Sequence, residues 1–171
     1  AFKEIKGTFG KVHVNFGEPI HLNALLDSKF PQWKHEKYKE ETPPIWLKEA
    51  IDFTGNHIIT SINNAVVINP VSLISLIMLS THKHAMDEKA LEWQLNFYLT
   101  FLKEAPYSSA MVVTSLTGAE IIQYCEKLDV ILRQQHPFGD ILVIADKKAV
   151  LLTYFRNNNI HVLFFIQNSN P

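Results

Sequence analysis

Cysteine is nearly absent from the sequence, because Cys125 is the single cysteine among 171 residues. One thiol excludes an internal disulfide framework and a metal site built from cysteines alone, and it fits a reducing compartment. Because Cys125 lies within a helical pattern, we expect it to be a small buried thiol.

Net charge is nearly absent as well. The 16 lysines and arginines face 17 aspartates and glutamates, which gives a formal charge of −1. With this balance the whole chain has no net electrostatic attraction to nucleic acid or anionic lipid, so any such contact has to depend on a local group of charges. We therefore expect no nucleic-acid partner.

Long apolar runs are also missing. The most apolar window, residues 65–79, is interrupted by Asn69, Pro70 and two serines, and it is shorter than the roughly 20 residues that cross a bilayer. It therefore predicts a buried helix. The chain starts without methionine or a charged-then-apolar leader, which is typical of a trimmed start, and its abrupt end after residues 162–166 suggests that more protein follows.

Hydrophobic residues make up 47% of the chain, which is enough for a real core in one ordinary domain or two small ones. Residues 10–20 alternate apolar and polar side chains before Gly17 and Pro19, which predicts a half-buried strand that ends in a turn. Residues 27–48 mix both charge signs with prolines and aromatics and predict a surface connection held by the aromatics. We place the main boundary there.

Helices are expected to dominate the rest of the chain. Thr42 can cap a helix over residues 42–63, with a proline in its first turn. A second helix is expected over residues 70–79. Asp87 stands at the start of a third, whose wide apolar face ends before Pro106.

The last part of the chain predicts a helix, a hairpin and a closing helix. Thr117 and Glu120 have the spacing of a capping box ahead of an apolar stretch. Residues 130–132 and 141–144 flank a turn and predict a short hairpin. Residues 147–165 suit either a strand or a helix by composition, and we favour the helix.

The densest group of histidines contains His82 and His84, and His82 with Asp87 spells His-x-x-x-x-Asp. In that dyad a carboxylate orients an imidazole that deprotonates an alcohol. Two fixed residues often match by chance, and Asp87 stands where the next helix needs an N-cap, so we favour capping. Histidines two apart face the same way only on a strand and lack a third ligand nearby, so we predict no metal site.

Arg156 is followed by three asparagines, beginning with Asn157, inside an otherwise apolar segment. Burying such groups is costly unless they have polar partners. We expect Arg156 to be substantially buried, with its guanidinium paired to a carboxylate, carbonyls or amides. Polar packing between helices is the favoured role, and contact with a phosphate or an acyl carrier is the alternative.

Several strings resemble one family when they are taken in order along nearly the whole chain. They are VHVNFGEPI (12–20), INNAVVINP (62–70) with Leu73, LST (79–81), PYS (106–108), GDI (139–141), and AVLLTYFRNN (149–158) with His161. Together they resemble the bacterial membrane glycerol-3-phosphate 1-O-acyltransferases. Several unrelated strings in the same order are far harder to match by chance than one short motif.

The resemblance implies a fatty acyl transfer from acyl carrier protein or coenzyme A to the sn-1 hydroxyl of glycerol-3-phosphate. This step belongs to phospholipid biosynthesis at the cytoplasmic face of the bacterial inner membrane, and it implies no cofactor. The family's catalytic blocks lie upstream of residues 12–20, and residues 82–87 fall where the family has a loop before a helix. We therefore assign no catalytic or substrate-binding residue, and we expect the chain to be inactive alone.

The resemblance also implies a domain organisation. Residues 1–28 would end an acyltransferase α/β core, residues 29–44 would be a linker, and residues 45–171 would be an incomplete, mostly helical C-terminal region. The expected fold class is α+β and helix-rich, with one strand left over from the core and a short hairpin after the helices.

An alternative of another class is a winged-helix-like module without enzymatic activity. A helix at 87–104, a helix at 117–128 and a hairpin at 130–145 have the order of such a module, which binds nucleic acid or protein. The second of these helices carries mostly acidic residues, so a role facing phosphates is poorly supported.

Overall fold

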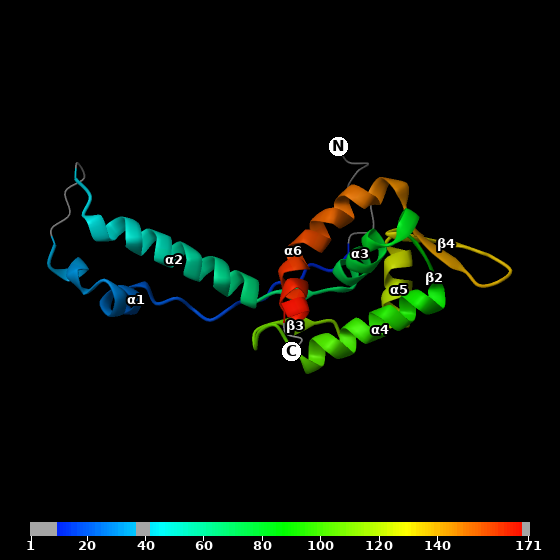
Figure 1. Ribbon diagram of the computed structural model, residues 1–171, viewed down its shortest axis with the longest axis horizontal. Coiled ribbons are helices and arrows are strands. Elements are labelled where there is room, and N and C mark those ends of the chain that lie inside the picture. The colour runs from blue at the N-terminus through cyan, green and yellow to red at the C-terminus, as the bar shows by residue number, and fades with distance from the viewer. Residues whose placement is uncertain (1–9, 37–41, 169–171) are drawn as a thin grey trace. The chain divides into compact units, whose positions relative to one another are not determined.

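The computed structural model describes residues 10–36 and 42–168. The chain is α+β and helix-rich, as expected (Figure 1). The α-helices are α1 (Leu22–Lys29), α2 (Ile45–Asn64), α3 (Pro70–Ser80), α4 (Glu88–Glu104), α5 (Gly118–Lys127) and α6 (Ala149–Asn168). The strands are β1 (Val67–Ile68), β2 (Ala85–Asp87), β3 (Val112–Val113), β4 (Ile131–Gln134) and β5 (Ile141–Ile144), and the short 3-10 turns are η2 (Pro31–Lys34), η3 (His82–His84) and η4 (Asp146–Lys148).

The described residues fall into two compact units. One contains residues 16–36 and 42–65, and the other contains residues 10–15 and 66–168. The larger unit holds the main hydrophobic core, which draws on α3, α4, α5, α6 and the β4–β5 hairpin. None of the helices in the described part of the chain combines the length and apolar character that crossing a bilayer requires.

Helix α3 is the buried helix that the apolar window predicted. Leu73, Ile74, Ile77 and Met78 are at most 2% exposed, and α3 packs against α4, α5 and α6. Asn69 fixes its start through a reciprocal capping box with Ser72, in which each side chain accepts from the other residue's backbone N–H. A helix that is apolar on every side is stable only when other elements surround it, which makes α3 the centre of this unit.

Local capping signals fix α4 and α5 where the sequence predicted them. The Asp87 carboxylate accepts from the backbone N–H of Ala90 at 3.1 Å, and Thr117 forms a full capping box with Glu120. The predicted apolar stripe of α4 faces the core. Cys125 on α5 is fully buried, as expected, and burial raises the pKa of its thiol to about 12.

The strands form two small sheets. The predicted hairpin is present as an antiparallel β4–β5 pair, and β2 joins it to give the order β2-β5-β4. The sequence placed β2 in a loop before α4. A second sheet pairs β1 with β3 in parallel, and neither of these strands was predicted. Residues 149–168 form helix α6, as favoured.

The strand expected over residues 10–20 is wrong, because these residues belong to no strand. Val12, Val14 and Phe16 are 89%, 71% and 87% exposed, so they are not half-buried. Alternation only shows which face a strand would bury, whereas a strand forms only where a neighbouring strand supplies hydrogen-bond partners. In the described residues no strand pairs with this segment.

The smaller unit also corrects two expectations. Helix α2 begins at Ile45 with Pro44 at its N-cap position and no side-chain cap, so Thr42 does not cap it. The surface connection expected over residues 27–48 contains the end of α1 and all of η2, and the sequence predicted neither. Its aromatics do hold it, because the Trp33 indole donates to Asp27 at 2.8 Å.

Two glycines provide a matched test of the packing. A Cβ on Gly118 would lie 2.8 Å from the backbone oxygen of Glu92, whereas a Cβ on Gly55 would meet nothing within 4 Å. We expect Gly118→Ala to lower the free energy of unfolding by about 1–3 kcal/mol through overpacking. Gly55→Ala should raise it by about 0.5–1 kcal/mol through helix propensity. Urea unfolding of both variants measures the difference, and equal effects would contradict the close α4–α5 approach.

Candidate functional site

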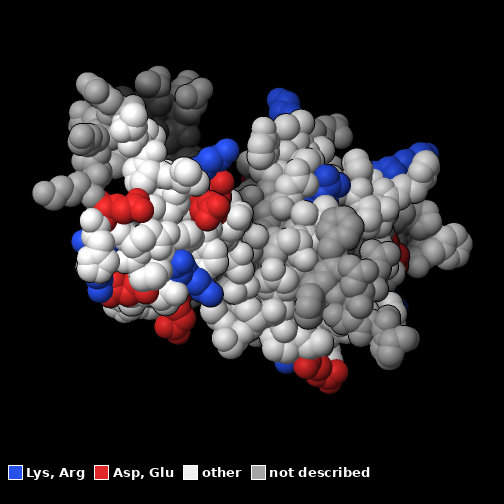
Figure 2. Space-filling view, turned by 60° about the vertical axis from the view of Figure 1, so that its left-hand side comes forward, with Lys and Arg blue, Asp and Glu red and all other residues white. Residues whose placement is uncertain are grey.

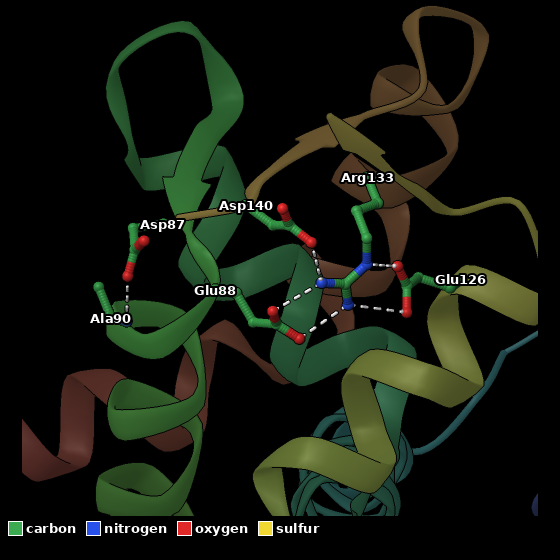
Figure 3. Close-up of polar contacts among 6 residues, drawn as sticks. All are labelled: Asp87, Glu88, Ala90, Glu126, Arg133 and Asp140. Carbon is green, nitrogen blue, oxygen red and sulfur yellow. Dashed lines mark hydrogen bonds and ion pairs between the residues drawn. The ribbon is translucent and has the colours of Figure 1, made fainter. Parts of the chain in front are cut away.

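The densest polar cluster among the described residues surrounds Arg133 on β4 (Figure 3). The guanidinium lies 2.6 Å from Glu88 at the start of α4, 2.8 Å from Glu126 near the end of α5 and 2.9 Å from Asp140 just before β5. A backbone hydrogen bond of 3.0 Å from Glu88 to Asp140 closes the cluster. Three elements of the unit are therefore joined through one side chain.

The Arg133 guanidinium has no donor to spare. Nε donates to Glu126, Nη1 to Glu88 and Asp140, and Nη2 to Glu88 and Glu126. These bonds use all five N–H donors of the side chain. They raise the pKa of Arg133, with Glu88 as the largest cause, and the hydrogen bond from Arg133 lowers the pKa of the Glu88 carboxyl. The cluster is suited to hold elements together, and a substrate phosphate would have to displace carboxylates already bound.

The structure keeps His82 and Asp87 in separate roles. His82 lies exposed in η3, and no hydrogen bond joins it to Asp87 within the part of the chain that the structure describes. In Figure 3 the Asp87 carboxylate is linked to the first turn of α4 at Ala90. The Nδ1 atom of His84 lies 3.3 Å from the backbone oxygen of Met78. The expected capping role of Asp87 is confirmed.

Arg156 is half-buried on α6, and not substantially buried as expected. Its Nε and Nη2 atoms donate to the Oδ1 atom of Asn157 at 3.3 Å and 3.2 Å. The predicted amide partner is therefore present, but it is the next residue in the chain and lies at the surface. A pair of this kind leaves the guanidinium in contact with solvent, so the burial cost that motivated the expectation is small.

One small apolar hollow lies between α3, α4 and α6. Its lining includes Leu73, Leu102, Asn159 and Val162. Its free space of about 10 Å³ is close to what one water molecule needs, so it cannot receive an acyl chain as it stands. No set of three histidine, cysteine or acidic side chains within the described residues is placed to hold a metal ion.

The chain is similar to known proteins over nearly its whole length. The family model described as the glycerol-3-phosphate acyltransferase C-terminal region matches residues 1–167. The chain belongs to that family. Its relatives include glycerol-3-phosphate acyltransferases of Xanthomonas campestris pv. campestris, 44% identical over 160 residues, and of Xylella fastidiosa strain 9a5c, 41% identical over 160 residues. The acyltransferase of Pseudomonas syringae pv. tomato is 37% identical over 158 residues.

This acyltransferase C-terminal region is a small part of those relatives. The alignments cover 94% of the chain but 18% of the Xanthomonas and Xylella proteins, and 92% of the chain but 19% of the Pseudomonas protein. No solved structure matches the chain. Most of each relative's length therefore lies outside the region described above.

Sequence reasoning about the acyltransferase C-terminal region missed Arg133. Its partner Glu88 lies 45 positions away in the chain, and neither residue belongs to a motif. The usable signal was that Arg133 follows a predicted hairpin strand directly, and an arginine there needs an acidic partner near the same sheet. The partner could be chosen only once β2 was known to bring the start of α4 beside β5.

The cap of α4 can be tested by two substitutions at one position. We expect Asp87→Ala to lower the free energy of unfolding by about 1 kcal/mol, because the N–H of Ala90 loses its acceptor. Asp87→Asn should remain close to the unchanged chain, since an amide oxygen also accepts. Urea unfolding measures both, with His82→Ala as a control that should have almost no effect. A loss with asparagine as large as with alanine would argue against capping.

The Arg133 cluster predicts a pH dependence. Because the folded-state pKa of Glu88 is lowered, its contribution to stability is present above its unfolded pKa, about 4.3, and is lost as the pH falls through the folded value. We expect Arg133→Met to be destabilising at pH 7 and much less so at pH 3, as measured by urea unfolding. Arg156→Met is the control, because its amide partner does not titrate. A destabilisation by Arg133→Met that is equal at both pH values would contradict the ion-pair account.

Proposed function

We propose that the chain is the C-terminal region of an enzyme that transfers a fatty acyl group to the sn-1 hydroxyl of glycerol-3-phosphate. The acyl donor would be acyl carrier protein or coenzyme A carrying the fatty acid. The observation that carries this proposal is the family match over residues 1–167, together with relatives that are named glycerol-3-phosphate acyltransferase. The step would belong to phospholipid biosynthesis.

Within that enzyme, the chain would act as a non-catalytic region. The polar groups of the described residues support this role, since Arg133 is fully occupied by carboxylates and Asp87 caps a helix. Acyl transfer to an alcohol needs a base that reaches the hydroxyl. We propose that this base and the phosphate-binding groups lie in the longer protein, outside these 171 residues.

We further propose that residues 1–28 end the acyltransferase α/β core, with residues 29–44 as a linker and residues 45–171 as the helical C-terminal region. The first part rests on the resemblance of residues 12–20 to the bacterial membrane acyltransferases. The whole enzyme would work at the cytoplasmic face of the bacterial inner membrane. That location rests on the resemblance to the bacterial membrane acyltransferases.

The winged-helix-like alternative draws support from topology alone. Helices α3, α4 and α5, with β2 after the first helix and the β4–β5 hairpin after the third, follow the element order of such modules. Nucleic acid is a poor partner on charge, since Glu120 lies exposed on α5. Basic and acidic groups are also interspersed on the face drawn in Figure 2. A DNA titration at increasing salt would show the salt dependence that phosphate contacts require.

The non-catalytic role can be tested directly. We expect the 171-residue chain to form no lysophosphatidate from glycerol-3-phosphate and a labelled acyl donor above a control without protein. The full-length enzyme, assayed in parallel with both acyl donors, should form it. Product formation by the chain alone would overturn the proposal that the catalytic groups lie elsewhere, and inactive full-length enzyme would overturn the proposed reaction.

A further inference from the structure

Lysines of the larger unit gather at one end of the β2-β5-β4 sheet. Because β5 runs antiparallel to both of its neighbours, the turn before β2, the turn after β5 and the turn before β4 lie at the same end. These turns are η3, η4 and residues 128–130, and the backbone N–H of Ala145 donates to the oxygen of Val130 at 3.3 Å. We call this surface the lysine end, and its lysines are Lys83, Lys127, Lys147 and Lys148.

The helices bring two of these turns together independently of the sheet. The small hollow is lined by Ser72 in the first turn of α3 and by Asn159 and Val162 in the second half of α6. Helices α3 and α6 pack against each other and therefore run in opposite directions. The end of α3, which leads into η3, then lies near the start of α6, which follows η4. Lys83 and Lys147 consequently belong to neighbouring turns.

The lysines are available to a partner within the part of the chain that the structure describes. The side chains of Lys83, Lys127 and Lys147 are exposed, and that of Lys148 is half-buried. Exposed Lys11 adjoins them, because its backbone N–H donates to the hydroxyl of Tyr124 in the last turns of α5 at 2.9 Å.

The acidic residues of the larger unit lie mostly away from the lysine end. By sequence, Asp129 and Asp146 are the acidic residues of its three turns, and Arg133 already binds Glu126 near the end of α5. Glu88 and Asp140 lie at the opposite end of the sheet, where β2 ends and β5 begins. The lysine end therefore keeps an excess of positive charge. It supplies the local group of charges through which a nearly neutral chain attracts an acidic partner.

The backbone at Lys83 supports a role for its side chain. Lys83 and His84 have φ angles of 57° and 50°, in the left-handed region that glycine adopts readily and other residues adopt rarely. A glycine would form this turn more easily than a lysine. The turn by itself therefore does not explain why a lysine stands at its most exposed point.

Apolar side chains beside the lysines indicate that the partner is a protein. Val150, Leu151 and Tyr154 in the first two turns of α6 are 73%, 47% and 67% exposed, and they follow directly on Lys148. An apolar centre with a polar rim is typical of protein–protein interfaces. The lysines come from separate turns, whereas the element that lies on an anionic bilayer is typically one amphipathic helix that carries its own basic residues. The lysine end thus fits an acidic protein better than a bilayer.

We propose that the lysine end docks an acidic surface of the acyl carrier protein that delivers the acyl group. The inference rests on the proposed function, whose two donors are acyl carrier protein and coenzyme A. A folded protein contacts lysines on three separate turns more readily than a single coenzyme does. Opposite charges across such an interface raise the association rate and select the correct partner.

Steady-state kinetics of the full-length enzyme with both donors test the proposal. The double variant Lys83→Glu/Lys147→Glu reverses two exposed charges of the lysine end, and Lys89→Glu/Lys103→Glu reverses two exposed charges on α4 as a matched control. We expect the first variant to raise the KM for the acylated carrier protein about tenfold, because the charge attraction is lost. Its KM for acyl coenzyme A and its kcat with either donor should stay unchanged. The control variant should change neither KM.

The two donors separate the possible failures. An equal rise in KM for both donors, no rise for the carrier protein, or the same rise in the control would overturn the docking proposal. An enzyme that uses acyl coenzyme A but neither uses nor binds the acylated carrier protein would overturn it as well. An unchanged enzyme that forms lysophosphatidate from neither donor would instead overturn the proposed function.

A photo-crosslink tests the contact without turnover. In the full-length enzyme, held in phosphatidylglycerol vesicles, benzoylphenylalanine replaces Tyr154 beside the lysine end or, as a control, Phe97, which is 54% exposed on α4. We expect irradiation to join acyl carrier protein to the Tyr154 variant and several-fold less to the Phe97 variant. The yield should fall as salt is added, because salt screens exposed charges. Crosslinks only to lipid, only to the same polypeptide, or in equal yield from both positions would overturn the proposal.

Discussion

The larger unit depends on the need to surround α3. The buried residues of α3 lie on all sides of the helix, so it cannot be stable at a surface; they are Pro70, Ser72, Leu73, Ile74, Ser75, Ile77 and Met78. Helices α4, α5 and α6 each present an apolar face to it, and their own polar faces then form the outside of the unit. The capping box at Asn69 matters for the same reason, because it fixes where this central helix starts and therefore which side chains meet each neighbour.

Outside that core, the ion pairs of Arg133 contribute only modestly to the stability of the larger unit. Its side chain and those of its three acidic partners are 24–37% exposed, so solvent screening reduces what each ion pair contributes. The value of the cluster lies in its geometry, because a planar guanidinium with five bonds allows little variation in how β4 meets the ends of α4 and α5. Because all five N–H donors of Arg133 are bonded to carboxylates, Arg133 is a poor candidate for a phosphate contact.

Sequence reasoning succeeded where the deciding interaction was local. Asp87, Thr117 and the helical stripe of α4 were predicted because a cap and its helix lie within a few residues. It failed where pairing is non-local. Strands β1, β2 and β3 have two or three residues each, too few to show a period, and residues 10–20 have the period but no strand that pairs with them. Arg156 was misjudged because an apolar neighbourhood in sequence does not determine which side of α6 is buried.

The two units differ in how far the apolar faces of their helices are buried. In the larger unit the apolar faces of α3, α4, α5 and α6 pack against one another, and the hollow between α3, α4 and α6 is only about the size of a water molecule. In the smaller unit Ile51 and Ile62 remain more than half exposed, although the same transfer free energy acts on them. No local sequence signal separates these cases. An amphipathic helix has the same pattern of apolar residues whether the residues that pack on it are near in the chain or far away. The distinction becomes visible only when burial is compared between the units, and it indicates that the smaller unit depends on contacts beyond its own residues.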